Sequence, residues 1–173
     1  MKYKLIMFDL DGTLTEPKSG ERFPKTIDDR RILPGREEKL LELSQNGIKM
    51  CIITNQGGAA WGIIDAVEMS DFLFSFCNQL QIDYFFVCYR DTSEKARISP
   101  KTIKELTETD YYKEWDRRKP GPGMIEEGLD HFGIDRFDAL FVGDRQEDRD
   151  AAENSGVDFQ WAWDFFKEGP IMA

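Results

Sequence analysis

The sequence predicts an α/β fold built on a doubly wound, mostly parallel, five-stranded sheet. Three observations lead to this prediction. Short apolar runs typical of buried strands alternate with helical segments, polar residues follow several of these runs directly, and 173 residues suit one domain. Such alternation favours helices on both faces of a parallel sheet, with ligands bound beyond the carboxyl ends of its strands.

The first three elements form a strand–helix–strand unit. The apolar run KLIMFDL, residues 4–10, has the composition of a buried strand. Residues 34–47 predict a helix, because a Pro-Gly pair precedes regularly spaced leucines and a glycine marks the end. Residues 48–54, IKMCIIT, predict the second strand.

The same reading continues to the end of the chain. Helical patterns alternate with three further strand-like runs, and a glycine ends the last helix. The expected elements are a helix over about 60–79, a strand at 82–89, a helix over about 122–132, a strand at 137–143, a helix at 147–156 and a strand at 157–162.

Two segments interrupt this alternation. Residues 14–33 are polar and punctuated by proline, which predicts a flap after the first strand. Residues 90–117 form a charged insertion in which a helix is expected from about residue 100. Neither is long enough for a domain of ordinary size, so we expect one domain over residues 1–173 without a large cap.

Composition narrows the class of protein. The formal net charge of −10 disfavours nonspecific binding to nucleic acid or to anionic membranes. The sequence has no apolar stretch of membrane-spanning length and no secretory leader pattern. Cys51, Cys77 and Cys88 lie in apolar contexts without a Cys-x-x-Cys pair. Reduced core thiols in a cytoplasmic protein are therefore expected.

Two carboxylates, Asp9 and Asp11, follow the first strand in the stretch DLDGT. Like charges about 4 Å apart repel by roughly 1 kcal/mol in water and about 4 kcal/mol at an effective dielectric near 20. Either a cation lies between them or one carboxylate holds a proton, as a general acid must. A calcium loop is excluded, since Leu14 and Gly20 occupy its required glycine and glutamate positions. An acidic turn without chemistry stays possible from this stretch alone.

Further polar residues lie after other predicted strands or in turns. Thr54 and Asn55 begin the stretch TNQGG, which suits phosphate oxygens, although Thr-Asn also caps helices. Lys119 precedes a proline-glycine turn, and Asp144 and Asp148 follow the fourth strand. Each is weak evidence alone, because surface lysines and helix-capping acids are common. Together and in this order they favour one site at the carboxyl edge of the sheet.

The stretches DLDGT, TNQ, KP and GDRQED, in that order, resemble the four motifs of the haloacid dehalogenase superfamily, whose core is Rossmann-like. TNQGG together with RKPGPGM resembles its subclass IIIA, the group of histidinol-phosphate phosphatases, heptose bisphosphate phosphatases and polynucleotide 3′-phosphatases. Some of these relatives carry a zinc loop. Cys88 is the only cysteine near the RKP turn and His131 lies beyond it, so no zinc is expected.

This resemblance implies the chemistry of the site. Asp9 would be the nucleophile that forms an aspartyl-phosphate, and Asp11 the general acid and base. Thr54 and Lys119 would hold phosphoryl oxygens, with Asn55 nearby. Arg118 is a candidate substrate clamp, although an ordinary surface ion pair is an equal alternative.

The resemblance also implies a magnesium ion. Its ligands would be Asp9, the backbone carbonyl of Asp11 and Asp144, with Asp148 as a nearby acid. Mg²⁺ and Lys119 would bring three positive charges against four negative charges from the phosphate, Asp9 and Asp144. Oxygen ligands of this kind suit Mg²⁺.

The expected function is therefore a Mg²⁺-dependent phosphomonoester hydrolase that acts on a small phosphorylated metabolite. A nucleic-acid 3′-phosphatase is the alternative, because an open site accepts a bulky substrate. A binding module that kept the fold without catalysis is a third hypothesis, disfavoured by the retention of every catalytic residue type.

Overall fold

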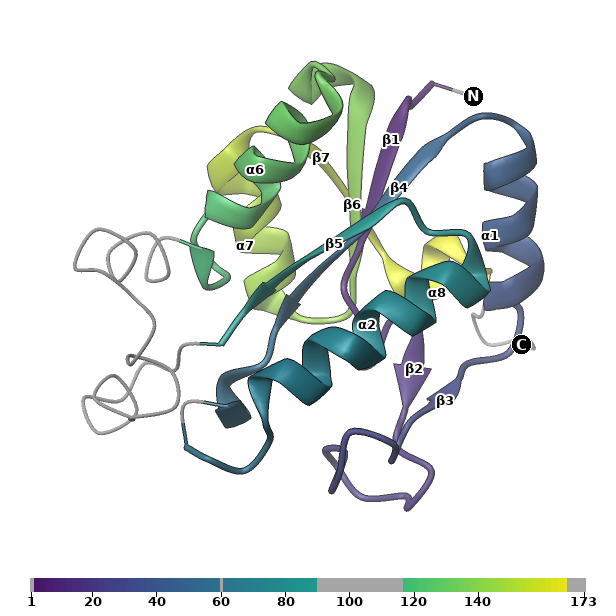
Figure 1. The fold of residues 1–173 in the computed structure, drawn as a ribbon. Helices are drawn as coiled ribbons and strands as arrows, with labels where there is room; N and C mark the ends of the chain where they lie inside the picture. The colour runs from purple at the N-terminus through teal and green to yellow at the C-terminus, as the bar shows by residue number, and fades with distance from the viewer. Residues whose placement is uncertain (1, 60, 90–116, 168–173) are drawn as a thin grey trace.

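A five-stranded parallel sheet forms the centre of the computed structural model, which describes residues 2–59, 61–89 and 117–167 (Figure 1). The strand order is β5-β4-β1-β6-β7, so the first strand is central and the chain winds outwards to both sides. The five predicted strands are confirmed as β1 (Leu5–Phe8), β4 (Lys49–Asn55), β5 (Tyr84–Cys88), β6 (Ala139–Gly143) and β7 (Asp158–Trp161).

Helices cover both faces of the sheet because alternate strand residues point to opposite sides. Ile6 and Phe8 of β1 are buried with residues of α1 (Arg36–Gln45), α2 (Ala66–Leu80) and α8 (Ala162–Phe165). Leu5 and Met7 are buried with residues of α6 (Gly123–Phe132) and α7 (Gln146–Ser155). Figure 1 shows α6 and α7 on one side of the sheet and α1, α2 and α8 on the other. The predicted doubly wound fold is confirmed.

Helix α2 begins later than the sequence predicts. The expected start was near residue 60, whereas a short 3₁₀ turn, η1 (Gly57–Ala59), comes first and the helix begins at Ala66. Asp65 sets this boundary, because its carboxylate accepts hydrogen bonds from the backbone N–H groups of Val67 and Glu68 at 2.9 and 3.1 Å. A second 3₁₀ turn, η2 (Arg136–Asp138), leads into β6.

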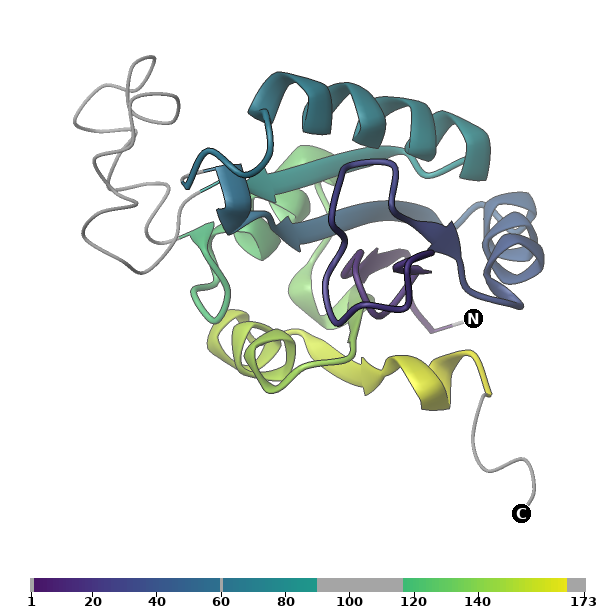
Figure 2. The same cartoon turned by 90° about the horizontal axis from the view of Figure 1, so that it is seen from below.

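The segment predicted as a flap contains an antiparallel hairpin, β2 (Thr15–Glu16) and β3 (Arg31–Ile32), joined by a loop over 17–30. Asp29 stabilises this loop from within. Its carboxylate accepts hydrogen bonds from the N–H and the hydroxyl of Ser19 and from the N–H of Lys25, all at 2.7–2.8 Å. Figure 2 looks onto the carboxyl edge of the sheet and shows the loop in front of it.

Among the described residues there is no separate cap domain. The predicted insertion at 90–117, with its helix from about residue 100, lies outside them except for its last residue. In the described part of the chain, no helix has the length and hydrophobicity needed to cross a bilayer. Cys51, Cys77 and Cys88 are buried and form no disulfide.

Two of the aromatic residues after β7 pack against Phe8 of the central strand. Phe165 and Phe166 lie with their ring centroids 5.6 and 6.0 Å from that of Phe8. The guanidinium of Arg36, the first residue of α1, lies 4.1 Å from the Phe166 ring centre, and its Nε donates to the Thr13 carbonyl at 2.8 Å. Burial lowers the pKa of Arg36 to about 10. This end of the chain thus supports the loop that follows β1.

Candidate active site

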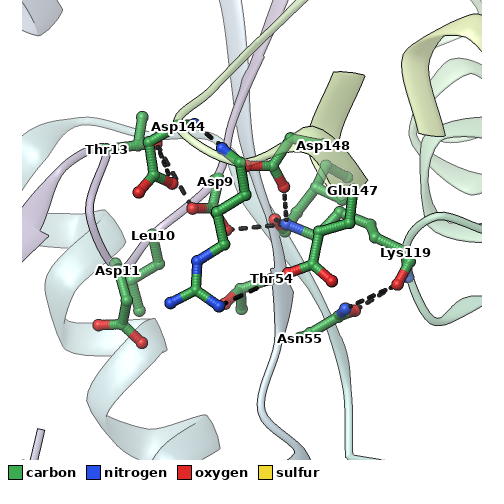
Figure 3. A network of polar contacts seen from close by, with 12 residues as sticks. Asp9, Leu10, Asp11, Thr13, Thr54, Asn55, Lys119, Asp144, Glu147 and Asp148 are labelled. Atoms are coloured by element: carbon green, nitrogen blue, oxygen red, sulfur yellow. Dashed lines mark hydrogen bonds and ion pairs between the residues drawn. The ribbon is translucent and has the colours of Figure 1, made fainter. Parts of the chain in front are cut away.

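The site lies where the three central strands end (Figure 3). Asp9 follows β1, Thr54 is the penultimate residue of β4, and Asp144 follows β6. Because Phe8 pairs in register with both Ile52 and Val142, the residues after these positions are brought to one edge. The structure therefore brings together polar groups more than a hundred residues apart in the sequence.

Lys119 is the cation at the centre of the site. Its ammonium group is almost fully buried and donates to Asp9 Oδ1 at 2.8 Å, Asp148 Oδ1 at 2.7 Å and the Ile53 carbonyl at 3.0 Å. Burial alone would lower the pKa of Lys119, but the charges of Asp148 and Asp9 outweigh it and raise the pKa above its usual range. The lysine is thus a permanent positive charge beside the predicted nucleophile.

Asn55 holds the backbone of Lys119 in place. Its side-chain oxygen accepts from the Lys119 N–H, and its side-chain nitrogen donates to the Lys119 carbonyl, both at 3.1 Å. The predicted phosphate contact of Asn55 stays a prediction, because this amide already has two partners. Arg118 precedes Lys119 on the turn, where its carbonyl accepts from the Gly121 N–H at 2.7 Å. Its role as a substrate clamp also stays a prediction.

Asp9, Asp144 and Asp148 form an acidic cluster in which one oxygen from each lies within 4.8 Å of the others. Burial and the negative charge of Asp148 raise the pKa of Asp9 well above its usual value, although Lys119 opposes this. Burial likewise raises the pKa of Asp144, and the charge of Asp148 adds to it. Three carboxylates against one ammonium leave the cluster short of positive charge. A divalent cation with oxygen ligands fits this donor set.

The three acids differ in how free they are to bind such a cation. Asp148 uses both oxygens within the protein, because Oδ1 accepts from Lys119 and Oδ2 accepts from the N–H groups of Asp144 and Arg145, each at 3.1 Å. The hydroxyl of Thr13 lies 3.4 Å from Asp9 Oδ2 and 3.3 Å from Asp144 Oδ1. Because both Thr13 contacts are long, Asp9 Oδ2 and Asp144 Oδ1 are better placed than the Asp148 oxygens to bind such a cation.

Gly12 allows Asp144 to approach the loop after β1. Its φ of +90° is a conformation that side chains disfavour, and a Cβ atom there would lie 2.0 Å from Asp144 Oδ2. The glycine of DLDGT is thus required both for the turn and for the space that Asp144 occupies.

Asp11 has surroundings that the sequence did not predict. Its carboxylate accepts from Arg30 Nε at 2.7 Å, Arg30 Nη2 and Gln56 Nε2 at 3.1 and 3.0 Å, and Thr15 Oγ1 at 3.2 Å. Burial opposes ionisation of Asp11, but the hydrogen bonds and charge of Arg30 outweigh it and lower the pKa. Arg30 thus favours the ionised form of Asp11, and the expectation that Asp11 holds the proton during the reaction stays a prediction. It is Asp9 that has the raised pKa.

Three functional candidates escaped the sequence reasoning: Thr13, Arg30 and Gln56. Thr13 and Gln56 lie within the stretches DLDGT and TNQ, so the sequence already indicated that they are near the site. Arg30 had none, because it lies in a polar segment with several arginines and lysines. Only the folding of the hairpin brings it to Asp11.

Comparison with known proteins gives a consistent picture. Residues 4–166 match the family model described as polynucleotide kinase 3 phosphatase. The chain is 28% identical over 152 residues to the D-glycero-beta-D-manno-heptose-1,7-bisphosphate 7-phosphatase of Photorhabdus laumondii, covering 85% of this chain and 73% of the relative. The enzyme of the same name from Haemophilus ducreyi is 29% identical over 157 residues, covering 91% and 81%.

A solved structure extends the likeness to three dimensions. The D,D-heptose 1,7-bisphosphate phosphatase of B. bronchiseptica, in complex with magnesium and phosphate, superposes with a TM-score of 0.68 at 25% identity. The match covers 90% of this chain and 78% of that one.

Proposed function

The chain belongs to the polynucleotide kinase 3 phosphatase family and is a phosphatase of the haloacid dehalogenase superfamily, and we propose that it hydrolyses phosphate monoesters through an aspartyl-phosphate on Asp9. The observation that carries this proposal is the contact of Asp9 with the buried ammonium of Lys119 at 2.8 Å. A carboxylate can attack a phosphate dianion only where positive charge lowers their repulsion. Lys119 supplies that charge at the position of attack.

In the first half of the reaction, a carboxylate oxygen of Asp9 attacks phosphorus and the bond to the alcohol oxygen breaks. Asp11 gives its proton to that oxygen. Asp11 gains this proton when a substrate phosphate lies beside it, since a neighbouring negative charge raises the pKa of a carboxyl group. In the second half, Asp11 takes a proton from water, which attacks phosphorus and releases phosphate and the free Asp9 carboxylate.

Thr54 is prepared to bind a phosphoryl oxygen. Its Oγ1 accepts a hydrogen bond from Gln56 Nε2 at 2.9 Å, so its own proton is directed elsewhere. The hydroxyl and the Lys119 ammonium would hold the phosphoryl group against Asp9.

Mg²⁺ is the cation that we propose for the acidic cluster. Asp9, Asp144 and the backbone carbonyl of Asp11 would hold it, with Asp148 orienting Asp144 through its backbone N–H. A bound Mg²⁺ would neutralise charge on the phosphoryl oxygens. The cluster itself supplies only oxygen donors, as this ion prefers.

The proposed substrate is a small phosphorylated metabolite of the sugar phosphate class. Relatives that cover most of this chain act, by their names, on a heptose bisphosphate. The net charge of −10 also favours a small anion, whose binding depends on local positive charge, over an extended polyanion.

A nucleic-acid 3′-phosphate is the second candidate, and one surface residue favours it. Phe23, on the hairpin loop, is 52% exposed, and the guanidinium carbons of Arg22 and Arg145 lie 5.2 and 5.4 Å from its ring centre. An exposed aromatic ring close to two cations suits stacking on a base beside a phosphate. The name of the matching family points the same way.

One set of assays tests both candidates. Hydrolysis of p-nitrophenyl phosphate with Mg²⁺ or with EDTA tests the phosphatase mechanism, and a panel of sugar phosphates and 3′-phosphorylated oligonucleotides then tests the substrate. Sugar phosphates should give the highest kcat/KM, and Phe23→Ala should leave that value unchanged. A preference for oligonucleotides, lost in Phe23→Ala, would overturn the metabolite assignment. Mg²⁺-independent turnover would overturn the choice of cofactor.

A further inference from the structure

Arg30 donates hydrogen bonds to both oxygens of the Asp11 carboxylate. The residue ends the hairpin loop, directly before β3, and its side chain is only 4% exposed. Nε donates to Asp11 Oδ1 at 2.7 Å and Nη2 donates to Asp11 Oδ2 at 3.1 Å. A two-point contact from a planar guanidinium fixes the plane of a carboxylate as well as its distance.

The guanidinium is itself held by three separate parts of the chain. Nη1 donates to the Ile27 carbonyl within the loop at 2.8 Å, and Nη2 lies 3.3 Å from Gln56 Oε1, after β4. The ring of Phe72, on α2, lies 5.4 Å from the guanidinium carbon. The orientation of Arg30 is therefore set before any substrate arrives.

Gln56 extends this arrangement to the phosphate-binding side of the site. Its Nε2 lies 3.0 Å from Asp11 Oδ2 and 2.9 Å from Thr54 Oγ1. Two of the guanidinium contacts described above lead towards the reacting groups: the contact with Asp11, and the contact with Gln56, which itself donates to Asp11 and Thr54. These contacts place Arg30 where it can act on the reaction through Asp11.

We propose that Arg30 is a positioning residue, which orients the Asp11 carboxylate for proton transfer to the leaving alcohol. The proposal rests on the proposed function, in which Asp11 protonates the alcohol oxygen as its bond to phosphorus breaks and the bond from Asp9 forms. The hairpin loop thus contributes to catalysis through one arginine. The alternative is a purely structural role, in which Arg30 only fastens the hairpin to the sheet.

Two esters with different leaving groups separate these roles. The p-nitrophenolate ion leaves phosphorus without a proton, whereas the alkoxide of phenethyl phosphate needs one. Values of kcat/KM report only the steps up to release of the alcohol, so the later hydrolysis of the aspartyl-phosphate does not mask the effect. General acid catalysis contributes about 10²–10⁴-fold where the leaving group needs it.

Arg30→Gln should lower kcat/KM for phenethyl phosphate by about 10²-fold, in line with a lost general acid, and for p-nitrophenyl phosphate far less. KM should change little for either ester. Arg30→Lys should restore part of the loss on the alkyl ester. Arg31→Gln is the matched control. Arg31 is the next residue along the chain, its side chain is 62% exposed and it pairs with Glu16 at 3.0 Å. This substitution should leave kcat/KM unchanged for both esters.

Equal losses on the two esters, or none on either, would overturn the positioning role. Circular dichroism and thermal unfolding identify a variant that has lost its fold, and Arg30→Lys then decides by its leaving-group dependence. A wild-type protein that hydrolyses neither ester would refute the proposed function itself, a result distinct from failure of the Arg30 proposal.

Discussion

Replacing Gly12 by alanine separates the chemistry of the site from the stability of the fold. A Cβ atom at residue 12 would lie 2.0 Å from Asp144 Oδ2 and 2.7 Å from its Cγ. Ordinary contacts begin at about 3.5 Å, so the Asp144 carboxylate must move by roughly 1.5 Å. A displacement of about 1 Å in a catalytic site can cost about 10²-fold in rate. We therefore expect Gly12→Ala to lose about two orders of magnitude in kcat/KM.

Gly47→Ala is the matched control. Gly47 has a φ of +75°, close to the +90° of Gly12, but nothing lies within 4 Å of its added Cβ. Both variants should lose roughly 1–2 kcal/mol of stability from backbone strain, measured by urea unfolding. Activity on p-nitrophenyl phosphate should fall only in Gly12→Ala. Equal activity in the two variants would refute a catalytic or metal-binding role for Asp144.

Three further variants test the charges of the site. Lys119→Met should lower the free energy of unfolding by about 3–5 kcal/mol and kcat by about 10²–10³-fold, because Asp9 and Asp148 lose their buried cation. Lys4→Met, at an exposed ion pair, should lower the free energy of unfolding by less than about 1 kcal/mol. Comparable losses of stability in the two variants would contradict this expectation. Asp9→Asn should abolish turnover. The raised pKa of Asp9 means that the folded state keeps a proton that the unfolded chain releases, so wild-type stability in EDTA is lost as the pH rises above about 4. The stability advantage of Asp9→Asn in urea unfolding should therefore grow as the pH rises above about 4, and a difference that stays constant with pH would count against this. Mg²⁺ should raise the unfolding temperature of the wild-type protein and of the surface variant Asp130→Asn, but not that of Asp144→Asn. An equal rise in Asp144→Asn and in the wild type would show that Asp144 is not a metal ligand.

The sheet was predictable because its signals are local. Buried parallel strands appear as apolar runs, and residues that end such runs meet at one edge, which is how Asp9, Thr54 and Asp144 could be grouped before the structure. The sequence pattern placed Lys119 only in a turn, and the family resemblance supplied its role, since no periodicity brings a turn lysine to the ends of β1 and β4. Its burial and its contacts with Asp9 and Asp148 appear only in three dimensions.

Other features depend on tertiary contacts that local patterns do not encode. The start of α2 is set by the Asp65 side chain, so the helix begins about six residues later than the sequence predicts. The lowered pKa of Asp11 depends on Arg30, nineteen residues away in a segment that has the sequence of an irregular loop. Repulsion between Asp9 and Asp11 was the expected problem of the site. In the structure, Lys119 pairs with Asp9 and Arg30 pairs with Asp11. Burial and the negative charges of Asp148 and Asp144 raise the pKa of Asp9.

Trapping the covalent intermediate tests the central claim most directly. Wild-type protein mixed with p-nitrophenyl phosphate and Mg²⁺, quenched in acid within the first turnover and digested, should give one peptide carrying a single phosphoryl group. Borohydride reduction of this acyl phosphate should place the modification at Asp9. Asp9→Asn protein should give none. A phosphoryl group on another residue, or turnover with an intact Asp9→Asn site, would contradict the assignment of Asp9 as the nucleophile.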